Sequence, residues 1–121
     1  MRVLIADNQS IVRHALRLLL EQAGEAQVVG DASQVQNLLA QAEESTPDLV
    51  LLGANLPGLN LVELLPALRR ANPEVKVIVL STHPEVSSAA LASGADGFLS
   101  KTETPERLLE MIIKVTEAKE D

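Results

Sequence analysis

The chain alternates between short runs of apolar residues and longer amphipathic segments, with five of each. The runs at 49–52 and 75–80 are almost entirely apolar, which is typical of parallel strands covered on both faces. The longer segments carry apolar residues three and four positions apart, the spacing that places them on one face of a helix. The predicted strands are residues 3–5, 28–30, 49–52, 75–80 and 97–99.

Polar residues and glycine mark the expected limits of the helices. Ser10, Ser33 and Thr104 are predicted N-caps, because a hydroxyl accepts a hydrogen bond from a free backbone N–H of the first turn. Gly24 is expected to end the first helix, and Pro105 suits the first position of the last one. The predicted apolar faces are Val12, Leu16, Leu19, Leu20 and Ala23; Val35, Leu38, Leu39 and Ala42; Leu61, Leu64, Leu65 and Leu68; and Leu108, Leu109, Ile112 and Val115, with a weakly amphipathic fourth helix at 84–93.

Regular alternation of strand and helix predicts right-handed crossovers and a single α/β domain over residues 1–121. The expected fold class is flavodoxin-like: a doubly wound, five-stranded parallel sheet of order 2-1-3-4-5 with helices on both faces. In the third helix, Pro66 lacks a backbone donor and is expected to kink the helix or delay its start. Ligands of such sheets bind beyond the carboxyl ends of the strands. The candidate site residues are therefore Asp7, Asn8, Gly53, Ser81, Thr82, Ser100 and Lys101.

Composition narrows the classes of function. The 121 residues include no cysteine, which excludes disulfides and thiolate metal sites. The net charge of −7 disfavours direct nucleic-acid binding by this domain, so a DNA-binding domain would lie outside this chain. No apolar run approaches the ~20 residues of a membrane span, and we expect a cytoplasmic protein without membrane contact. The chain has no P-loop and no G-x-S-x-G motif, which favours a protein that is not an enzyme.

Several motifs follow one another in a fixed order along nearly the whole chain. They are Arg2–Asp7, Ile11–Arg13 with Leu16, Pro47–Leu52, Leu56–Gly58, Val77–Ser81 and Gly94–Lys101. In these motifs the chain resembles the receiver domains of two-component signalling, in particular those of NarL/FixJ (LuxR-type) response regulators. The resemblance implies a phosphorelay switch in which an aspartate at the end of the third strand accepts a phosphoryl group.

The resemblance assigns roles to four residues by their positions. Asp7 matches one of two acidic residues that help to hold Mg²⁺. Ser81 and Lys101 match the hydroxyl and the lysine that contact the phosphoryl group, and Phe98 matches an aromatic switch residue at the interface.

Three positions depart from the family pattern. Asn8 stands where the second acidic residue belongs, Gly53 where the phosphoacceptor belongs, and Leu61 where a glycine is usual. Without a carboxylate at position 53 the pocket has no nucleophile to form an acyl phosphate. We therefore expect a degenerate phosphorylation pocket, no cofactor, and weak or absent Mg²⁺ binding. Lys101 loses its usual partner, and Asp7 is the nearest replacement.

Three residues keep alternative interpretations. Gly53 also fits a loop glycine with a positive φ, or an engineered substitution, although Asn8 and Leu61 favour natural divergence. Asp7 fits a capping or loop residue as well as a pocket residue. Phe98 fits plain core filling as well as a switch.

The expected function is that of a non-enzymatic regulatory receiver domain. It would act without phosphorylation, through contacts with a protein partner or in a homodimer, and would control a DNA-binding output domain outside this chain. The contact surface is expected around the fourth helix, fifth strand and fifth helix, or around the first and fifth helices. The alternative is a ligand-sensing receiver, in which the emptied pocket binds a small molecule or an anion in place of phosphate.

Overall fold

The computed structural model describes residues 1–24 and 26–117 and places five parallel strands in one sheet of order β2-β1-β3-β4-β5. The predicted fold class and strand order are confirmed. The strands are β1 (Arg2–Ala6), β2 (Gln27–Ala32), β3 (Leu49–Gly53), β4 (Lys76–Ser81) and β5 (Gly97–Ser100). The helices are α1 (Ser10–Ala23), α2 (Val35–Ser45), α3 (Leu61–Ala71), α4 (Val86–Ala92) and α5 (Pro105–Glu117).

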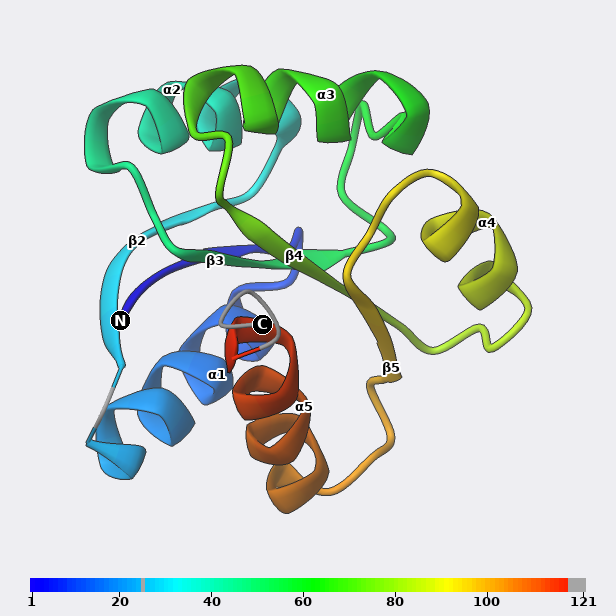
Figure 1. Cartoon of the computed structure of the whole chain (residues 1–121). Helices are drawn as coiled ribbons and strands as arrows, with labels where there is room; N and C mark the ends of the chain where they lie inside the picture. Colours follow the sequence, from blue (N-terminus) through cyan, green and yellow to red (C-terminus); the bar gives the residue numbers. More distant parts are fainter. Residues whose placement is uncertain (25, 118–121) are drawn as a thin grey trace.

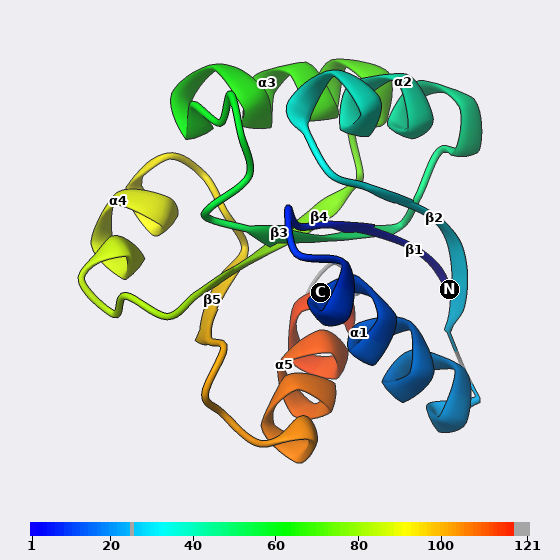
Figure 2. The ribbon, with the colours of Figure 1, turned by 180° about the vertical axis from the view of Figure 1, so that it is seen from behind.

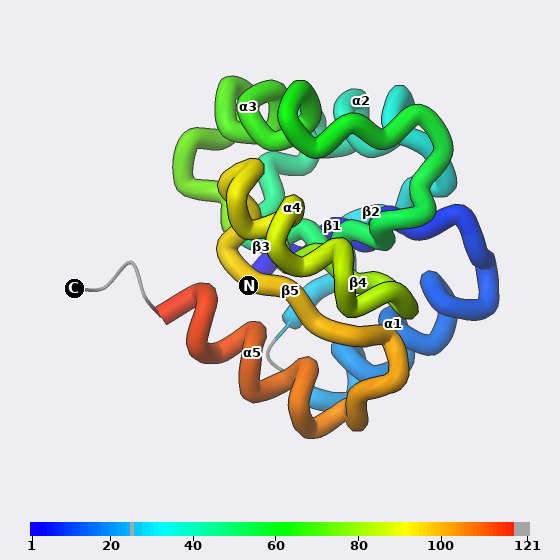
Figure 3. The backbone as a smooth tube through the Cα atoms, turned by 90° about the vertical axis from the view of Figure 1, so that its right-hand side faces the viewer, coloured from blue at the N-terminus to red at the C-terminus, as the bar shows by residue number. Residues whose placement is uncertain are grey.

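The helices cover the sheet in two layers. Figure 1 shows α2 and α3 above the sheet and α1 and α5 below it, and the reverse view in Figure 2 shows the same division. In the side view of Figure 3, α4 lies beside β5 at the edge of the sheet. The direction of crossover reverses between β1 and β3, so this point is where a doubly wound sheet opens toward ligands.

The central strands are buried on both faces, which accounts for their apolar runs. Alternate residues of a strand point to opposite faces. In β3, Val50 and Leu52 belong to the core that includes residues of α2 and α3, whereas Leu49 and Leu51 belong to the core shared with α1 and α5. All five residues of β3 are buried.

The predicted apolar faces of the two helices below the sheet point largely inward. In α5, Leu108, Ile112 and Val115 are buried. In α1, Leu20 is buried and Val12, Leu16 and Leu19 are half-buried, whereas Ala23 at the last position is exposed. The inclusion of Ala23 in the apolar face was therefore wrong, because the end of the helix extends past the sheet edge (Figure 1).

Two of the three predicted N-caps are wrong by one residue. Helix α1 begins at Ser10 and its N-cap is Gln9, whose carbonyl accepts hydrogen bonds from the backbone of Val12 and Arg13 at 3.1 Å. Helix α2 has Gln34 as its N-cap, and Ser33 lies exposed before it. Neither N-cap makes a side-chain cap bond. In both helices the main-chain carbonyl of the N-cap accepts the first helical hydrogen bonds, and the Val35 N–H of α2 also donates to the Pro57 carbonyl at 3.4 Å.

The cap of α5 is confirmed. The Thr104 hydroxyl oxygen accepts a hydrogen bond from the backbone N–H of Arg107 at 3.3 Å, and Pro105 occupies the first helical position. A proline costs nothing there, since the N–H of that residue has no partner within the helix.

Pro66 does not delay the start of α3, contrary to one of the two outcomes expected for it. The helix begins at Leu61, and the side chain of its N-cap Asn60 accepts a hydrogen bond from the Glu63 N–H at 3.4 Å. Pro66 lies on the exposed side of the helix, and so does Val62, four residues earlier, whose carbonyl loses its partner. Solvent can hydrogen-bond to this carbonyl, so the proline is tolerated.

Within residues 1–24 and 26–117, no helix is both long enough and apolar enough to cross a membrane.

Thr104→Ala should lower the free energy of unfolding by about 1 kcal/mol, because the first turn of α5 loses its side-chain cap. Ser33→Ala, a matched loss of a hydroxyl before α2, should change it by less than about 0.5 kcal/mol. Urea unfolding followed by circular dichroism measures both values. Equal losses in the two variants would contradict the assignment of the caps.

Candidate functional site

The register of the sheet brings the ends of four strands together. Ala6 of β1 pairs with Leu52 of β3, so the residues that follow them, Asp7 and Gly53, lie side by side. Ser81 pairs with Ser100 at the end of β4 and β5, and Lys101 follows directly. The structure therefore places these candidate residues at one end of the sheet, as the sequence predicts.

Asp7 and Lys101 form a buried ion pair. The Lys101 Nζ lies 2.6 Å from Asp7 Oδ2, and the two side chains are 13% and 1% exposed. Asp7 Oδ1 accepts a hydrogen bond from the backbone N–H of Gln9 at 2.9 Å. Oδ2 accepts no well-aligned hydrogen bond from any described residue, so the ammonium group compensates its charge by proximity rather than by hydrogen-bond geometry. Asp7, the residue expected to replace the lost partner of Lys101, is thus its partner in the structure.

Gly53 leaves the space that this pair occupies. A Cβ atom at position 53 would overlap Asp7 Oδ2 and would lie 2.9 Å from Asn55 Oδ1. The glycines with positive φ are Gly24, Gly58 and Gly94, so the alternative of a left-handed loop glycine at position 53 is wrong. The absence of a side chain, rather than an unusual backbone conformation, is what this position requires.

A hollow of about 290 Å³ opens beside the ion pair. We call it the strand-end hollow, and Ser81, Lys101, Asn55 and Thr82 are among the residues that line it. Ser81 is buried, and its hydroxyl oxygen accepts a hydrogen bond from the His83 N–H at 2.9 Å. Ser81 and Lys101 line this hollow, whereas Asp7 and Gly53 lie beside it at the same end of the sheet.

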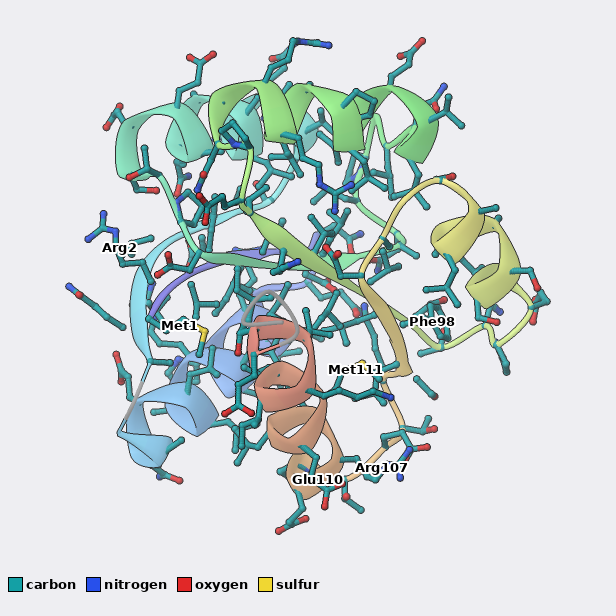
Figure 4. The ribbon with its side chains drawn as sticks, in the orientation of Figure 1. Met1, Arg2, Phe98, Arg107, Glu110 and Met111 are labelled. Atoms are coloured by element: carbon teal, nitrogen blue, oxygen red, sulfur yellow. The ribbon has the colours of Figure 1, made fainter. Side chains whose placement is uncertain are left out.

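The other two candidate residues lie apart from the ion pair. Asn8 is exposed and does not line the strand-end hollow. Phe98 is half-buried and packs against the core cluster that contains Ala90 of α4. Figure 4 shows its side chain beside β5, on the side of α4. This packing supports the core-filling interpretation of Phe98, and its role as a switch stays a prediction.

Two contacts of the site were missed from the sequence. The Lys101 ammonium also donates to Asn55 Oδ1 at 3.4 Å. The Arg13 guanidinium donates to the backbone carbonyl of Asp7 at 2.7 Å and so ties α1 to the end of β1. Asn55 follows the end of β3 by two residues, and this position at a strand end was the signal that could have identified it.

The donor set does not fit a Mg²⁺ ion. Mg²⁺ prefers carboxylate and water oxygens in an octahedral arrangement, and Asp7 is the carboxylate at these strand ends. Its Oδ2 lies against the Lys101 ammonium, which competes with any cation. The described residues contain no group of three His, Cys, Asp or Glu placed to hold a metal. Weak or absent Mg²⁺ binding remains a prediction, and the ion pair supports it.

A second depression runs between α1 and α5 on the lower face of the sheet. It has a volume of about 370 Å³, and we call it the α1–α5 groove. Its lining includes Ile11, Val12, Leu16, Leu19, Leu99 and Leu108. Ile11 is 76% exposed. An apolar depression with a large exposed side chain on its rim is a candidate contact surface.

Lys101→Met should lower the free energy of unfolding by about 3 kcal/mol, because it leaves the buried Asp7 carboxylate without a cation. Lys76→Met is the matched control. Lys76 lies 3.9 Å from Asp96, but Asp96 also binds Arg69 at 2.8 Å, so its charge stays compensated. The control should lose less than about 1 kcal/mol. Urea unfolding separates the two outcomes, and similar losses would show that the buried pair contributes nothing special.

Comparison with known proteins identifies the family. The model of the response regulator receiver domain matches residues 3–113. The chain is 37% identical over 112 residues to the nitrate/nitrite response regulator protein NarL of Escherichia coli (strain K12), covering 91% of this chain and 52% of that protein. It is 32% identical over 113 residues to the transcriptional regulatory protein DegU of Brevibacillus brevis, covering 92% of this chain and 48% of that protein. The chain thus spans about half the length of these curated relatives.

Solved structures agree. The signal receiver domain of the putative response regulator NarL from Mycobacterium tuberculosis superposes with a TM-score of 0.87 at 27% identity, covering 97% of this chain and 96% of that one. A LuxR-family DNA-binding response regulator from Staphylococcus aureus superposes with a TM-score of 0.84 at 27% identity, covering 95% of this chain and 98% of that one. The chain therefore belongs to the response regulator receiver domain family and is a receiver domain of the NarL/LuxR type.

Proposed function

We propose that this receiver domain works as a non-enzymatic regulatory module that does not depend on phosphorylation. One observation carries the proposal: Gly53 occupies the strand end at which the family resemblance expects the phosphoacceptor, and the Asp7 carboxylate fills the space above it. In a protein of the relatives' length, the module would control a DNA-binding output domain outside this chain.

The chemistry of the site supports this proposal. Acyl phosphate formation needs a carboxylate nucleophile that a phosphoryl donor can reach, with a cation to offset the charge of the entering oxygens. Asp7 is 1% exposed and its outer oxygen lies on Lys101. The Asp7 carboxylate therefore already places a negative charge against Lys101, the residue that would bind a phosphoryl group.

The α1–α5 groove is the surface that we propose for the protein contact. It is mainly apolar in its lining, and Ile11 stands exposed on its rim. We propose a second copy of this chain as the occupant, since a two-fold dimer is the commonest assembly and pairs identical patches with each other. The alternative surface around α4, β5 and α5 exposes Leu91 and Ile113, and neither residue lines the α1–α5 groove.

The ligand-sensing alternative has weaker support. A ligand in the emptied pocket would need space above Gly53, and the Asp7 carboxylate occupies that space. The strand-end hollow remains beside it, but Lys101 faces this hollow with its charge already paired. An anion would have to displace Asp7 from Lys101 and leave a buried carboxylate uncompensated, which is unfavourable.

Incubation with acetyl phosphate and Mg²⁺, or with beryllofluoride and Mg²⁺, should leave the mass, the melting temperature and the oligomeric state unchanged. The reason is that no accessible carboxylate stands at the end of β3. Intact-mass spectrometry, thermal unfolding and sedimentation velocity measure the three quantities. A mass gain of one phosphoryl group that hydroxylamine removes would show that another carboxylate serves as acceptor, and would overturn the proposal.

Ile11→Asp should weaken self-association by at least about tenfold, because it puts a charge into an apolar contact. Val62→Asp on α3, which is 70% exposed on the opposite face of the sheet, makes the same change in charge and should have no effect. Sedimentation velocity over a range of concentrations gives both dissociation constants. If the wild-type chain stays monomeric, or if the two variants behave alike, the α1–α5 groove is not a self-association surface.

A further inference from the structure

We infer that the Asp7–Lys101 ion pair is a structural clasp that shapes the α1–α5 groove, and that Gly53 is the positioning residue that makes the clasp possible. The inference rests on the proposed function only in treating the groove as the contact surface. In this inference the strand-end residues shape the partner surface permanently, whereas phosphorylation would switch that surface between two states.

Lys101 connects three other strand ends. Its ammonium lies 2.6 Å from Asp7 after β1 and donates at 3.4 Å to Asn55 after β3. Its backbone N–H donates to the Ser81 carbonyl at the end of β4 at 2.9 Å. Residue 101 itself is the first residue after β5. Releasing the ammonium from Asp7 would therefore remove the ion pair that joins this loop to the end of β1.

The same loop forms one wall of the α1–α5 groove. Ser100, Lys101, Glu103, Thr104 and Pro105 all line this groove, and Lys101 also lines the strand-end hollow on its other side. The loop is short, and its internal bonds include those of the Glu103 N–H to the Ser100 carbonyl at 3.1 Å and of the Thr102 N–H to the Ser100 hydroxyl at 3.2 Å, with the Ser100 and Thr102 hydroxyls 2.7 Å apart. The position of Lys101 therefore determines the position of the groove wall.

Gly53 controls this clasp through space alone. Its φ is not positive, so an alanine meets no backbone strain at this position. A glycine-to-alanine change at such a position ordinarily stabilises a protein, because it reduces the freedom of the unfolded chain. Here the added Cβ would overlap the Asp7 carboxylate and crowd Asn55, the two side chains that hold the Lys101 ammonium. A loss of stability in Gly53→Ala would therefore indicate disruption of the Asp7–Lys101 clasp, and not backbone strain at position 53.

The test is a double-mutant cycle of Gly53→Ala with Asp7→Ala. Gly53→Ala alone should lower the melting temperature by at least about 5 °C. In the Asp7→Ala background the same change should shift it by less than about 2 °C, because the carboxylate is gone and the remaining neighbour, the end of the Asn55 side chain, can move aside. Equal shifts in the two backgrounds would overturn the inference. Asp7→Ala also leaves Lys101 without its carboxylate, but that cost is common to the singly and doubly substituted chains and cancels in the comparison.

Hydrogen exchange supplies the second readout. The hydrogen-bonded amides of residues 101–103 should exchange at least about tenfold faster in Gly53→Ala and in Lys101→Met than in the wild type. The Lys76 N–H, which donates to the Asp48 carbonyl at the opposite end of the sheet, is the internal control and should exchange faster only as far as the loss of global stability requires, and by less than the loop amides. Unchanged exchange of the loop amides in both variants would overturn the inference, whether or not the chain self-associates.

The link to the partner surface is tested on the chain that self-associates. If Ile11→Asp abolishes self-association of the wild type, Gly53→Ala should weaken it by about tenfold. Unchanged affinity with a loosened loop would overturn the inference and leave the groove assignment intact. A wild type that never self-associates would overturn the groove assignment instead, while the cycle and the exchange data still decide whether the clasp exists.

Discussion

A carboxylate and an ammonium group buried against each other at the carboxyl ends of the strands are the interaction on which this site depends. Removing two charges from water is costly, and their mutual attraction repays that cost only when the geometry is close and further bonds assist. Asp7 and Lys101 meet at 2.6 Å, and the Gln9 N–H and Asn55 amide oxygen supply additional partners. The pair can form in this place only because residue 53 has no side chain.

The pair also explains why the pocket is not simply a receiver site with one residue missing. If Asp7 kept clear of position 53, loss of the acceptor would leave an open, positively charged space. Instead the Asp7 carboxylate lies over Gly53, and its negative charge compensates the positive charge of Lys101. The regulation by protein contact that we propose would then be constant, and Lys101, which lines both the α1–α5 groove and the strand-end hollow, would connect the two physically.

The parallel sheet supports both features. Its register sets Asp7 beside Gly53, and its buried central strands hold the four strand ends at fixed positions. The chain winds α1 and α5 onto one face of the sheet and α2 and α3 onto the other (Figure 1). Lys101 lines both the α1–α5 groove and the strand-end hollow. The Arg13 contact to the Asp7 carbonyl further joins the first helix of the groove to the pocket.

The order of apolar runs was enough to predict the fold, because strands buried on both faces must be apolar throughout and their alternation with helices leaves few topologies. The same order also placed Asp7, Gly53, Ser81 and Lys101 at one end of the sheet, since the carboxyl ends of parallel strands lie together. Helix starts were less predictable: Ser10 and Ser33 have the right side chains for caps, but main-chain contacts begin the helices one residue away. The reason for glycine at position 53 was decided by tertiary structure alone. Residue type suggested a backbone requirement, whereas the packing shows a spatial one, because the neighbour that excludes a side chain comes from a strand more than forty residues earlier.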